Sequence, residues 1–260
     1  MNFGLIIIGD EILSGKRQDK HFPKVVELLN ARGLKLSWAE YLGDDRDRLV
    51  ETLRRSFASG DAVFSCGGIG ATPDDHTRQA AGLALGLDLE LHPEAERLIA
   101  QRTAEMAAEG RGGSADMSTP ENRQRLKMGE FPVGAGIVPN PFNKIPGFEI
   151  RNHFFMPGFP VMAWPMIEWV LDHRFADLFH RNREGESSFL AYELPESKVT
   201  PLLEQIERDF PGIKVFSLPS VGENGERRHI ELGVKGPEHL LGPAFARLEQ
   251  GTRELGAEIG

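Results

Sequence analysis

The hydrophobic positions of the first 175 residues fall into short apolar runs that alternate with segments of helical periodicity. Residues 3–8 and 61–66 are largely apolar and are each followed by glycine, which is typical of strands buried on both faces of a sheet. Residues 19–32 and 46–57 carry apolar side chains at helical spacing instead. This alternation predicts an α/β unit in which helices cover a mostly parallel sheet.

The same patterns predict the other elements of this unit. Further strands are expected at 34–42, 133–138, 148–150 and 153–156. Further helices are expected at 73–86, 93–108, 120–127 and 162–173. The last of these helices closes the unit, so we expect a first domain at 1–180.

A polar segment without hydrophobic periodicity, residues 181–188, predicts a linker. Beyond it, the pattern predicts strand 189–194, helix 198–209, strand 213–218, a turn at 222–225, strand 228–234 and helix 238–254. This order is typical of a small α/β sandwich of the ferredoxin-like plan. We therefore expect a second domain at 188–260.

Charge and cysteine content narrow the classes of partner. The 260 residues include 30 Lys and Arg against 39 Asp and Glu, a net charge of −9. Such a surface repels nucleic-acid backbones and anionic membranes, so neither is an expected partner. No targeting segment is visible in the sequence, so a cytoplasmic protein is expected. The single cysteine excludes a disulfide within the chain and a zinc site built from several cysteines. A phosphorylated small ligand would have to be bound locally, by backbone dipoles or a metal.

The strongest local signal is the loop at 67–75, between a predicted strand and a predicted helix. Its glycines are Gly67, Gly68 and Gly70. Glycines permit turns that aim several N–H groups at one point, and a helix start adds a positive dipole, so the loop suits a phosphate. The residues equally fit an ordinary helix start, with Thr72 as N-cap, Pro73 in the first turn, and Asp74 and Asp75 complementing the dipole.

A second loop, residues 9–15, follows the first strand and carries Asp10 and Glu11. In an open α/β sheet, ligands bind outside the carboxyl ends of the strands. Carboxylates there, near Asp74 and Asp75, would repel a phosphate unless a divalent cation such as Mg²⁺ bridged them. The alternative is that Asp10 and Glu11 only cap the turn before a helix.

A third loop, residues 156–160, contains Pro157 and Gly158 and also joins a strand to a helix. Taken alone it fits an ordinary turn. Three such loops at one edge of a sheet favour a shared binding site.

Other candidates carry weaker signals. The histidines lack metal-ligand spacing and are expected at the surface or in caps: His21, His76, His153 and His180. Cys66 ends a buried strand and is expected to pack rather than react. The absence of a Gly-x-Ser-x-Gly elbow disfavours a serine hydrolase.

Together the three loops resemble the molybdopterin-binding (MoaB/Mog-like) domain family, over about residues 1–175. The version at the N-terminus of competence/damage-inducible protein A is the most similar, since further segments match it: Pro120-Glu121-Asn122-Arg123 and residues 140–148. The resemblance implies a three-layer α/β/α fold with the ligand at the carboxyl ends of the strands. It also implies assembly as a homo-oligomer, a dimer or a trimer.

The resemblance assigns roles to residues of the three loops. The implied phosphate- and ligand-binding residues are Gly67, Gly68, Gly70, Thr72, Ser14, Gly15, Asn122, Pro157 and Gly158. The implied metal ligands are Asp10, Glu11 and Asp75. Asp75 is the first candidate for a catalytic carboxylate and Asp74 the second, because relatives use the acidic residue after the glycine loop in magnesium-assisted adenylyl chemistry.

Several positions depart from the family pattern. Ala71 stands where proline is usual and Cys66 where threonine is common, and residues 143–146 place Lys144 beside the expected pocket. The nicotinamide-nucleotide amidase domain of longer relatives is not matched, so deamidase activity is not expected.

The expected function is the binding of a phosphorylated pterin (molybdopterin) or a nucleotide, with metal-assisted chemistry at the phosphate. One alternative is a metal-dependent nucleotide pyrophosphatase or nucleotidyl transferase acting on a compound such as ADP-ribose or FAD. Another is a binding or regulatory module without catalysis. Function depends on the site rather than on the fold, so all three stay open.

Overall fold

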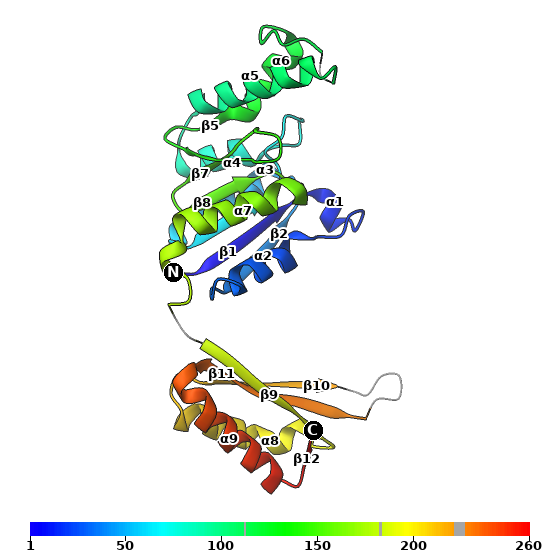
Figure 1. The fold of residues 1–260 in the computed structure, drawn as a ribbon, viewed down its shortest axis with the longest axis vertical. Coiled ribbons are helices and arrows are strands. Elements are labelled where there is room, and N and C mark those ends of the chain that lie inside the picture. Colours follow the sequence, from blue (N-terminus) through cyan, green and yellow to red (C-terminus); the bar gives the residue numbers. More distant parts are fainter. Residues whose placement is uncertain (112, 182–183, 221–226) are drawn as a thin grey trace. The chain divides into compact units, whose positions relative to one another are not determined.

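Two units make up the chain, Met1–Phe179 and His180–Gly260 (Figure 1). The computed structural model describes residues 1–111, 113–181, 184–220 and 227–260. Among these residues, no helix combines the length and the apolar character needed to cross a membrane.

A six-stranded sheet forms the centre of the first unit. Its strands, in spatial order, are β2 (Leu36–Leu42), β1 (Phe3–Ile8), β3 (Ala62–Cys66), β8 (His153–Met156), β7 (Gly147–Ile150) and β6 (Gly136–Val138). The first four strands are parallel, whereas β7 and β6 run antiparallel to their neighbours. The predicted mostly parallel sheet is confirmed.

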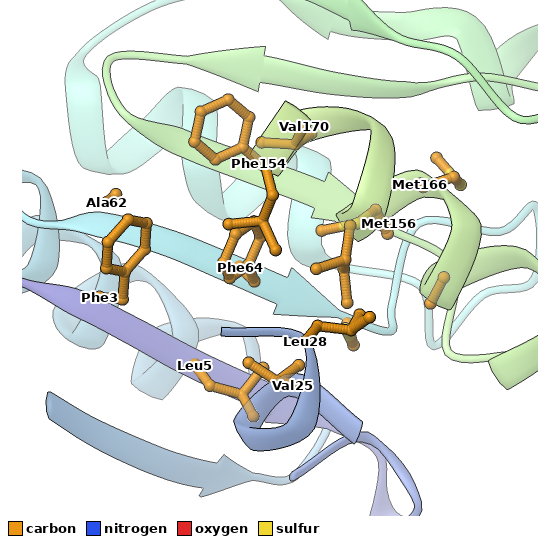
Figure 2. Packing of buried hydrophobic residues seen from close by; sticks show 14 of the residues in the cluster. Phe3, Leu5, Val25, Leu28, Ala62, Phe64, Phe154, Met156, Met166 and Val170 are labelled. Carbon is orange, nitrogen blue, oxygen red and sulfur yellow. The ribbon is translucent and has the colours of Figure 1, made fainter. Parts of the chain in front are cut away.

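Helices pack on both faces of this sheet. Alternate residues of β1 face opposite cores, because successive side chains of a strand point to opposite sides. Phe3, Leu5 and Ile7 pack with α2 (His21–Asn30) and α7 (Pro160–Arg174), as Figure 2 shows for Leu5 beside Val25. Ile6 and Ile8 pack with α3 (Arg46–Ser59) and α4 (Thr77–Leu85). The result is the expected three-layer α/β/α arrangement.

An insertion between α4 and β6 extends the second of these layers. It contains the two-stranded ribbon of β4 (Leu89–Leu91) and β5 (Glu130–Pro132), with α5 (Pro93–Ala108) and α6 (Pro120–Leu126) between them. Ala95 and Phe131 anchor the insertion in the core next to α3 and α4. The α6 helix is thereby brought beside the glycine loop.

The second unit is an antiparallel sheet covered by two helices. Its strands lie in the order β10 (Lys214–Ser220), β11 (His229–Pro237), β9 (Glu184–Tyr192) and β12 (Glu258–Ile259). The helices α8 (Glu196–Asp209) and α9 (Glu238–Glu254) share one apolar core with the sheet. This strand order is that of the ferredoxin-like plan, as predicted.

The predicted linker at 181–188 is wrong over most of its length. Strand β9 already begins at Glu184, and its pairing with β11 runs from Glu184 to Tyr192. Hydrophobic periodicity is absent here because backbone pairing and polar contacts hold this part of the strand. Ser188 Oγ, for example, donates a hydrogen bond to the Glu231 carboxylate at 2.6 Å. The predicted turn at 222–225 lies outside the described residues.

Candidate functional site

A cavity of about 340 Å³ lies at the carboxyl ends of the parallel strands of the first unit. The loops after β1, β3 and β8 all line it, together with Asp44 after β2. The sheet order places β1, β3 and β8 side by side, which is why loops far apart in the sequence meet there. The predicted convergence of the three loops is confirmed.

Two glycines of the loop after β3 are required by close packing. Gly67 has φ 114° and Gly68 has φ 68°, values that side-chain-bearing residues rarely adopt. A Cβ on Gly67 would lie 2.2 Å from the Ile8 carbonyl oxygen, and one on Gly68 would lie 2.2 Å from Thr77 Oγ1. The backbone therefore passes through a space in which no side chain fits.

Thr77 holds two carbonyl groups of this loop. Its Oγ1 donates to the Gly67 carbonyl at 3.0 Å, and its N–H donates to the Gly68 carbonyl at 3.0 Å. In a trans peptide the N–H points opposite to the carbonyl. The N–H groups of Gly68 and Ile69, which belong to those two peptides, therefore point away from Thr77.

Arg78 acts in the same way on the next part of the loop. Its buried guanidinium donates to the carbonyls of Ile69 at 2.9 Å and Gly70 at 2.7 Å. Burial lowers the pKa of Arg78, and the nearby Asp75 carboxylate opposes that shift. Because the Gly70 carbonyl faces Arg78, the N–H of Ala71 points away from it. The sequence carried no signal for this role, since an arginine inside a helix usually lies at the surface.

The carboxylate of Asp75 closes the loop from within. It accepts hydrogen bonds from the N–H of Gly70 at 2.8 Å, the N–H of Thr72 at 2.8 Å and Thr72 Oγ1 at 2.5 Å. The expected helix start at residue 73 with Thr72 as N-cap is therefore wrong. The α4 helix begins at Thr77, after His76, because Asp75 draws the preceding backbone into a turn.

The N–H groups that face the cavity differ from those expected. Gly67 donates its N–H to the Met156 carbonyl at 2.9 Å, and Gly70 donates to Asp75. Within the described residues, the N–H groups of Gly68, Ile69 and Ala71 have no hydrogen-bond partner in the protein, and all three residues line the cavity. A concave set of free N–H groups of this kind binds anions.

Acidic side chains from the loops after β1, β2 and β3 also line the cavity. They are Glu11, Asp44, Asp74 and Asp75, and Arg17 is the basic residue among the lining residues. Asp44 was missed by sequence reasoning, although it follows β2 and so lies at the same edge of the sheet. Burial and the charges of Asp10, Glu11 and Asp74 raise the pKa of Asp44, against the hydrogen bond from the Asp10 backbone.

Asp10 links two loops instead of lining the cavity. Its carboxylate accepts from the Asp44 N–H at 3.2 Å, and its own N–H donates to Asp44 Oδ2 at 3.0 Å. A Cβ at position 43 would lie 2.4 Å from Asp10 Oδ1, so Gly43 makes this close approach possible. Asp10 thus positions Asp44 beside the cavity.

The acidic residues do not form a metal site from protein atoms alone. Among the described residues, no group of three or more His, Cys, Asp or Glu side chains converges on one point. Carboxylate oxygens are nevertheless the ligands that Mg²⁺ prefers, together with phosphate oxygens and water. A cation at this cavity would therefore need phosphate oxygens and water to complete its shell.

The loop after β8 packs directly on the glycine loop. A Cβ on Gly158 would lie 3.4 Å from the Gly67 Cα atom. His21, at the start of α2, lies 3.0 Å through Nε2 from the Gly158 carbonyl and is buried, contrary to its expected place at the surface. His153 is also buried, with Nε2 2.6 Å from Ser56 Oγ. The surface or cap expected for both histidines is wrong, because each packs inside the unit.

Four other residues expected near the ligand do not line the cavity. Ser14 and Gly15 end the short helix α1 (Asp10–Leu13), where both N–H groups bond within the turn. Asn122 Nδ2 donates to the carbonyls of Ser114 and Asp116, so it holds the loop before α6. Lys144 forms an ion pair with Glu105 of α5.

Two further residues adjoin the glycine loop without lining the cavity, Cys66 at the end of β3 and Gln124 of α6. Cys66 is buried, and burial raises the pKa of its thiol, which agrees with the expected packing role. Gln124 of α6 donates through Nε2 to the Ala71 carbonyl at 2.8 Å. The insertion thus supports the glycine loop through Gln124.

The fold and the cavity define an α/β domain in which both free N–H groups and carboxylates line one cavity at the carboxyl ends of the parallel strands. Comparison with known families gives the class a name. Residues 4–177 match the family described as "Probable molybdopterin binding domain", and the chain belongs to this family.

Relatives of the chain include proteins of similar and of greater length. A CinA-like protein of Citrifermentans bemidjiense is 33% identical over 212 residues, which cover 78% of this chain and 47% of that protein. A protein of Caldivirga maquilingensis is 25% identical over 256 residues, covering 96% of this chain and 94% of its own. The chain spans about half the length of the CinA-like relatives it matches.

A solved structure supports the fold. The crystal structure of the protein CinA from Thermoplasma acidophilum has a TM-score of 0.55 and is 24% identical, covering 66% of this chain and 98% of that one. At this identity the similarity concerns the fold alone.

Proposed function

We propose that the first unit binds a phosphorylated pterin or nucleotide, with one phosphate on the N–H groups of Gly68, Ile69 and Ala71. Thr77 and Arg78 bind carbonyl groups of the glycine loop, so the N–H groups of the same peptides point away from these two residues. The observation that carries the proposal is that these N–H groups are free and belong to residues that line the cavity. Backbone N–H groups bind phosphate without a basic side chain, which suits a protein of net charge −9.

One or two of the carboxylates that line the cavity, from Glu11, Asp44 and Asp74, would bind a divalent cation together with the bound phosphate. Bound there, the cation would supply positive charge to the phosphate oxygens and offset the repulsion among the carboxylates. Burial, together with the charges of Asp10, Glu11 and Asp74, raises the pKa of Asp44, and a cation beside it would favour the ionised carboxylate. Asp75 is occupied with three donors of the loop, so its proposed role is to hold the loop in shape.

A calorimetric screen tests the binding proposal. Molybdopterin, ADP-ribose and FAD would each be titrated into the protein with and without Mg²⁺. We expect one of these ligands to bind, and to bind more tightly with the metal. Failure of all three to bind at millimolar concentration would contradict the proposal.

Hydrolysis of a pyrophosphate bond is a second candidate function. Asp74 favours it, because this carboxylate is exposed and lines the cavity. An ionised carboxylate beside a bound phosphate can orient a water molecule for attack. Release of AMP from ADP-ribose in the presence of Mg²⁺ would establish this activity, and binding without turnover would leave a binding module.

A homo-oligomer remains a proposal, supported by apolar side chains near the cavity. Leu13, Phe159 and Val161 are 57%, 55% and 53% exposed. Exposed apolar residues of this size favour contact with another protein surface, here a second copy. Sedimentation equilibrium distinguishes a dimer or trimer from a monomer.

A further inference from the structure

A second cavity, of about 280 Å³, adjoins the first across the glycine loop. Ala71, Thr72 and Asp75 line both cavities. The other lining residues come from the segment before α4, from α4 itself, from the start of α3, and from α6 and the segment after it. A ligand in the first cavity is therefore within reach of the second.

The second cavity carries positive charge that is not paired inside the protein. Arg46 at the start of α3 and Lys127 after α6 line it. Neither has an ion pair or a side-chain hydrogen bond to any part of the chain that the structure describes. His76, the residue before α4, also lines this cavity.

The two acidic side chains of this cavity, Asp75 and Glu130, both lie near the buried Arg78 guanidinium. Asp75 accepts three hydrogen bonds from its own loop. Glu130 lies in the field of the buried Arg78 guanidinium, which is also near Asp75. Arg78 Nε is buried and has no hydrogen-bond partner among the described atoms. An anion would therefore meet cationic groups that have no competing internal partner.

The two cavities share part of one loop but differ in the other charged groups that line them. The first combines free N–H groups with carboxylates that suit a cation, whereas the second offers Arg46 and Lys127. We propose that the second cavity binds a second phosphate group of the ligand whose first phosphate lies in the first cavity. This inference rests on the proposed function. It narrows the ligand class to compounds with two phosphate groups, one of which can lie on each side of the Ala71–Thr72 segment.

Inorganic phosphate is the simplest probe of the second cavity. It would be titrated into isotope-labelled protein without metal, and the amide NMR signals of Gln124 and Lys127 would be followed. We expect a saturable shift with a dissociation constant on the order of millimolar, as befits a single anion held by two cationic side chains.

Two double variants give a matched comparison. Arg46→Ala/Lys127→Ala removes Arg46 and Lys127 from the cavity, and Arg54→Ala/Arg123→Ala removes two exposed cations of α3 and α6 that do not line it. The first double variant is expected to weaken phosphate binding about tenfold or more, and the second by less than about twofold. An absent shift, or equal losses in both double variants, would overturn the proposal.

The first cavity has separate reporters in the same spectra. The amide signals of Gly68 and Gly158 are expected to move only when Mg²⁺ accompanies phosphate. If they never move while Gln124 and Lys127 still respond, the proposed function fails and the anion site stands. The reverse outcome leaves the proposed function in place and overturns the second site.

Tripolyphosphate with Mg²⁺ tests whether one ligand spans both cavities. Its affinity should fall about tenfold in Arg46→Ala/Lys127→Ala and by less than about twofold in the matched control, because only the first removes contacts of its far end. Equal affinity in both double variants would show that one ligand does not span the loop, and would overturn that part of the proposal.

Discussion

Asp75 Oδ1 accepts a hydrogen bond from the N–H of Gly70 at 2.8 Å and so closes the glycine loop on itself. The same carboxylate also accepts from Thr72 through its second oxygen. An acidic residue at this place is usually expected to act on the ligand. Here its oxygens are engaged with the loop, and the neighbouring Asp74 is the exposed carboxylate that lines the cavity.

We expect Asp75→Asn to destabilise the first unit. The amide has one acceptor oxygen, so its NH₂ group would face an N–H or hydroxyl donor of Gly70 or Thr72 and lose that bond. The free energy of unfolding should fall by about 1–3 kcal/mol, the usual cost of leaving such a group unpaired. Thermal and urea unfolding measure the change.

Asp74→Asn is the matched control for this substitution. Stability should stay close to that of the original chain, while Mg²⁺-dependent ligand binding weakens by about tenfold or more, as for loss of a group that supports a metal. Unchanged stability in Asp75→Asn together with lost turnover would instead make Asp75 a catalytic carboxylate.

Gly68 and Gly86 allow backbone strain to be separated from the close approach at the site. Both have φ 68°, but a Cβ on Gly68 would lie 2.2 Å from Thr77 Oγ1, whereas one on Gly86 meets nothing within 4 Å. Alanine at either position should cost about 1–2 kcal/mol for the left-handed backbone. Only Gly68→Ala should also abolish ligand binding, because it displaces the Thr77 hydroxyl that orients the loop. Calorimetry measures the ligand affinity of both variants. Equal affinities would show that the glycine loop is not part of the binding site.

Much of the sheet could be predicted because its strands are apolar throughout. Strand β1 was predicted at its observed bounds, Phe3–Ile8, and helices α5 and α9 were predicted at theirs. These elements carry complete local signals, such as Pro93 at the first helical position. The convergence of three loops also followed, because parallel strands end at one edge.

The start of α4 and the detailed site could not be predicted from local patterns. Thr72-Pro73 has the composition of a helix start, but the Asp75 carboxylate competes for the backbone of the loop and delays the helix to Thr77. Arg78 and His21 reach loops through tertiary contacts that no spacing in the sequence reports. Asp44 could have been predicted, because it follows β2 at the edge of the sheet where ligands bind, but it was missed.

Asp44→Asn is expected to stabilise the protein at neutral pH when no metal is added. The raised pKa of Asp44 means that its ionised form is disfavoured in the folded state, through burial and the charges of Asp10, Glu11 and Asp74. The amide oxygen can still accept from the Asp10 N–H. The melting temperature of the variant should exceed that of the original chain at pH 7, and this difference should vanish at low pH, where Asp44 is protonated. Asp88→Asn, at an exposed position, is the control and should leave the melting temperature unchanged. A lower melting temperature for Asp44→Asn would show that the ionised Asp44 carboxylate does not destabilise the folded protein.

His153 should make the first unit sensitive to acid. Burial lowers the pKa of His153 to about 4, against smaller opposing effects of the Arg151 backbone and the Asp61 carboxylate. Because the folded pKa lies below the unfolded value, the unfolded chain binds the proton first, so stability is complete above about pH 6.5 and falls by up to about 3 kcal/mol toward pH 4. Urea unfolding of the original chain and of His153→Gln between about pH 7 and about pH 4.5 measures this contribution as the difference in slope. Gln at His173, an exposed histidine of α7, should leave the slope unchanged; an identical slope in His153→Gln would show that the buried imidazole does not titrate on unfolding.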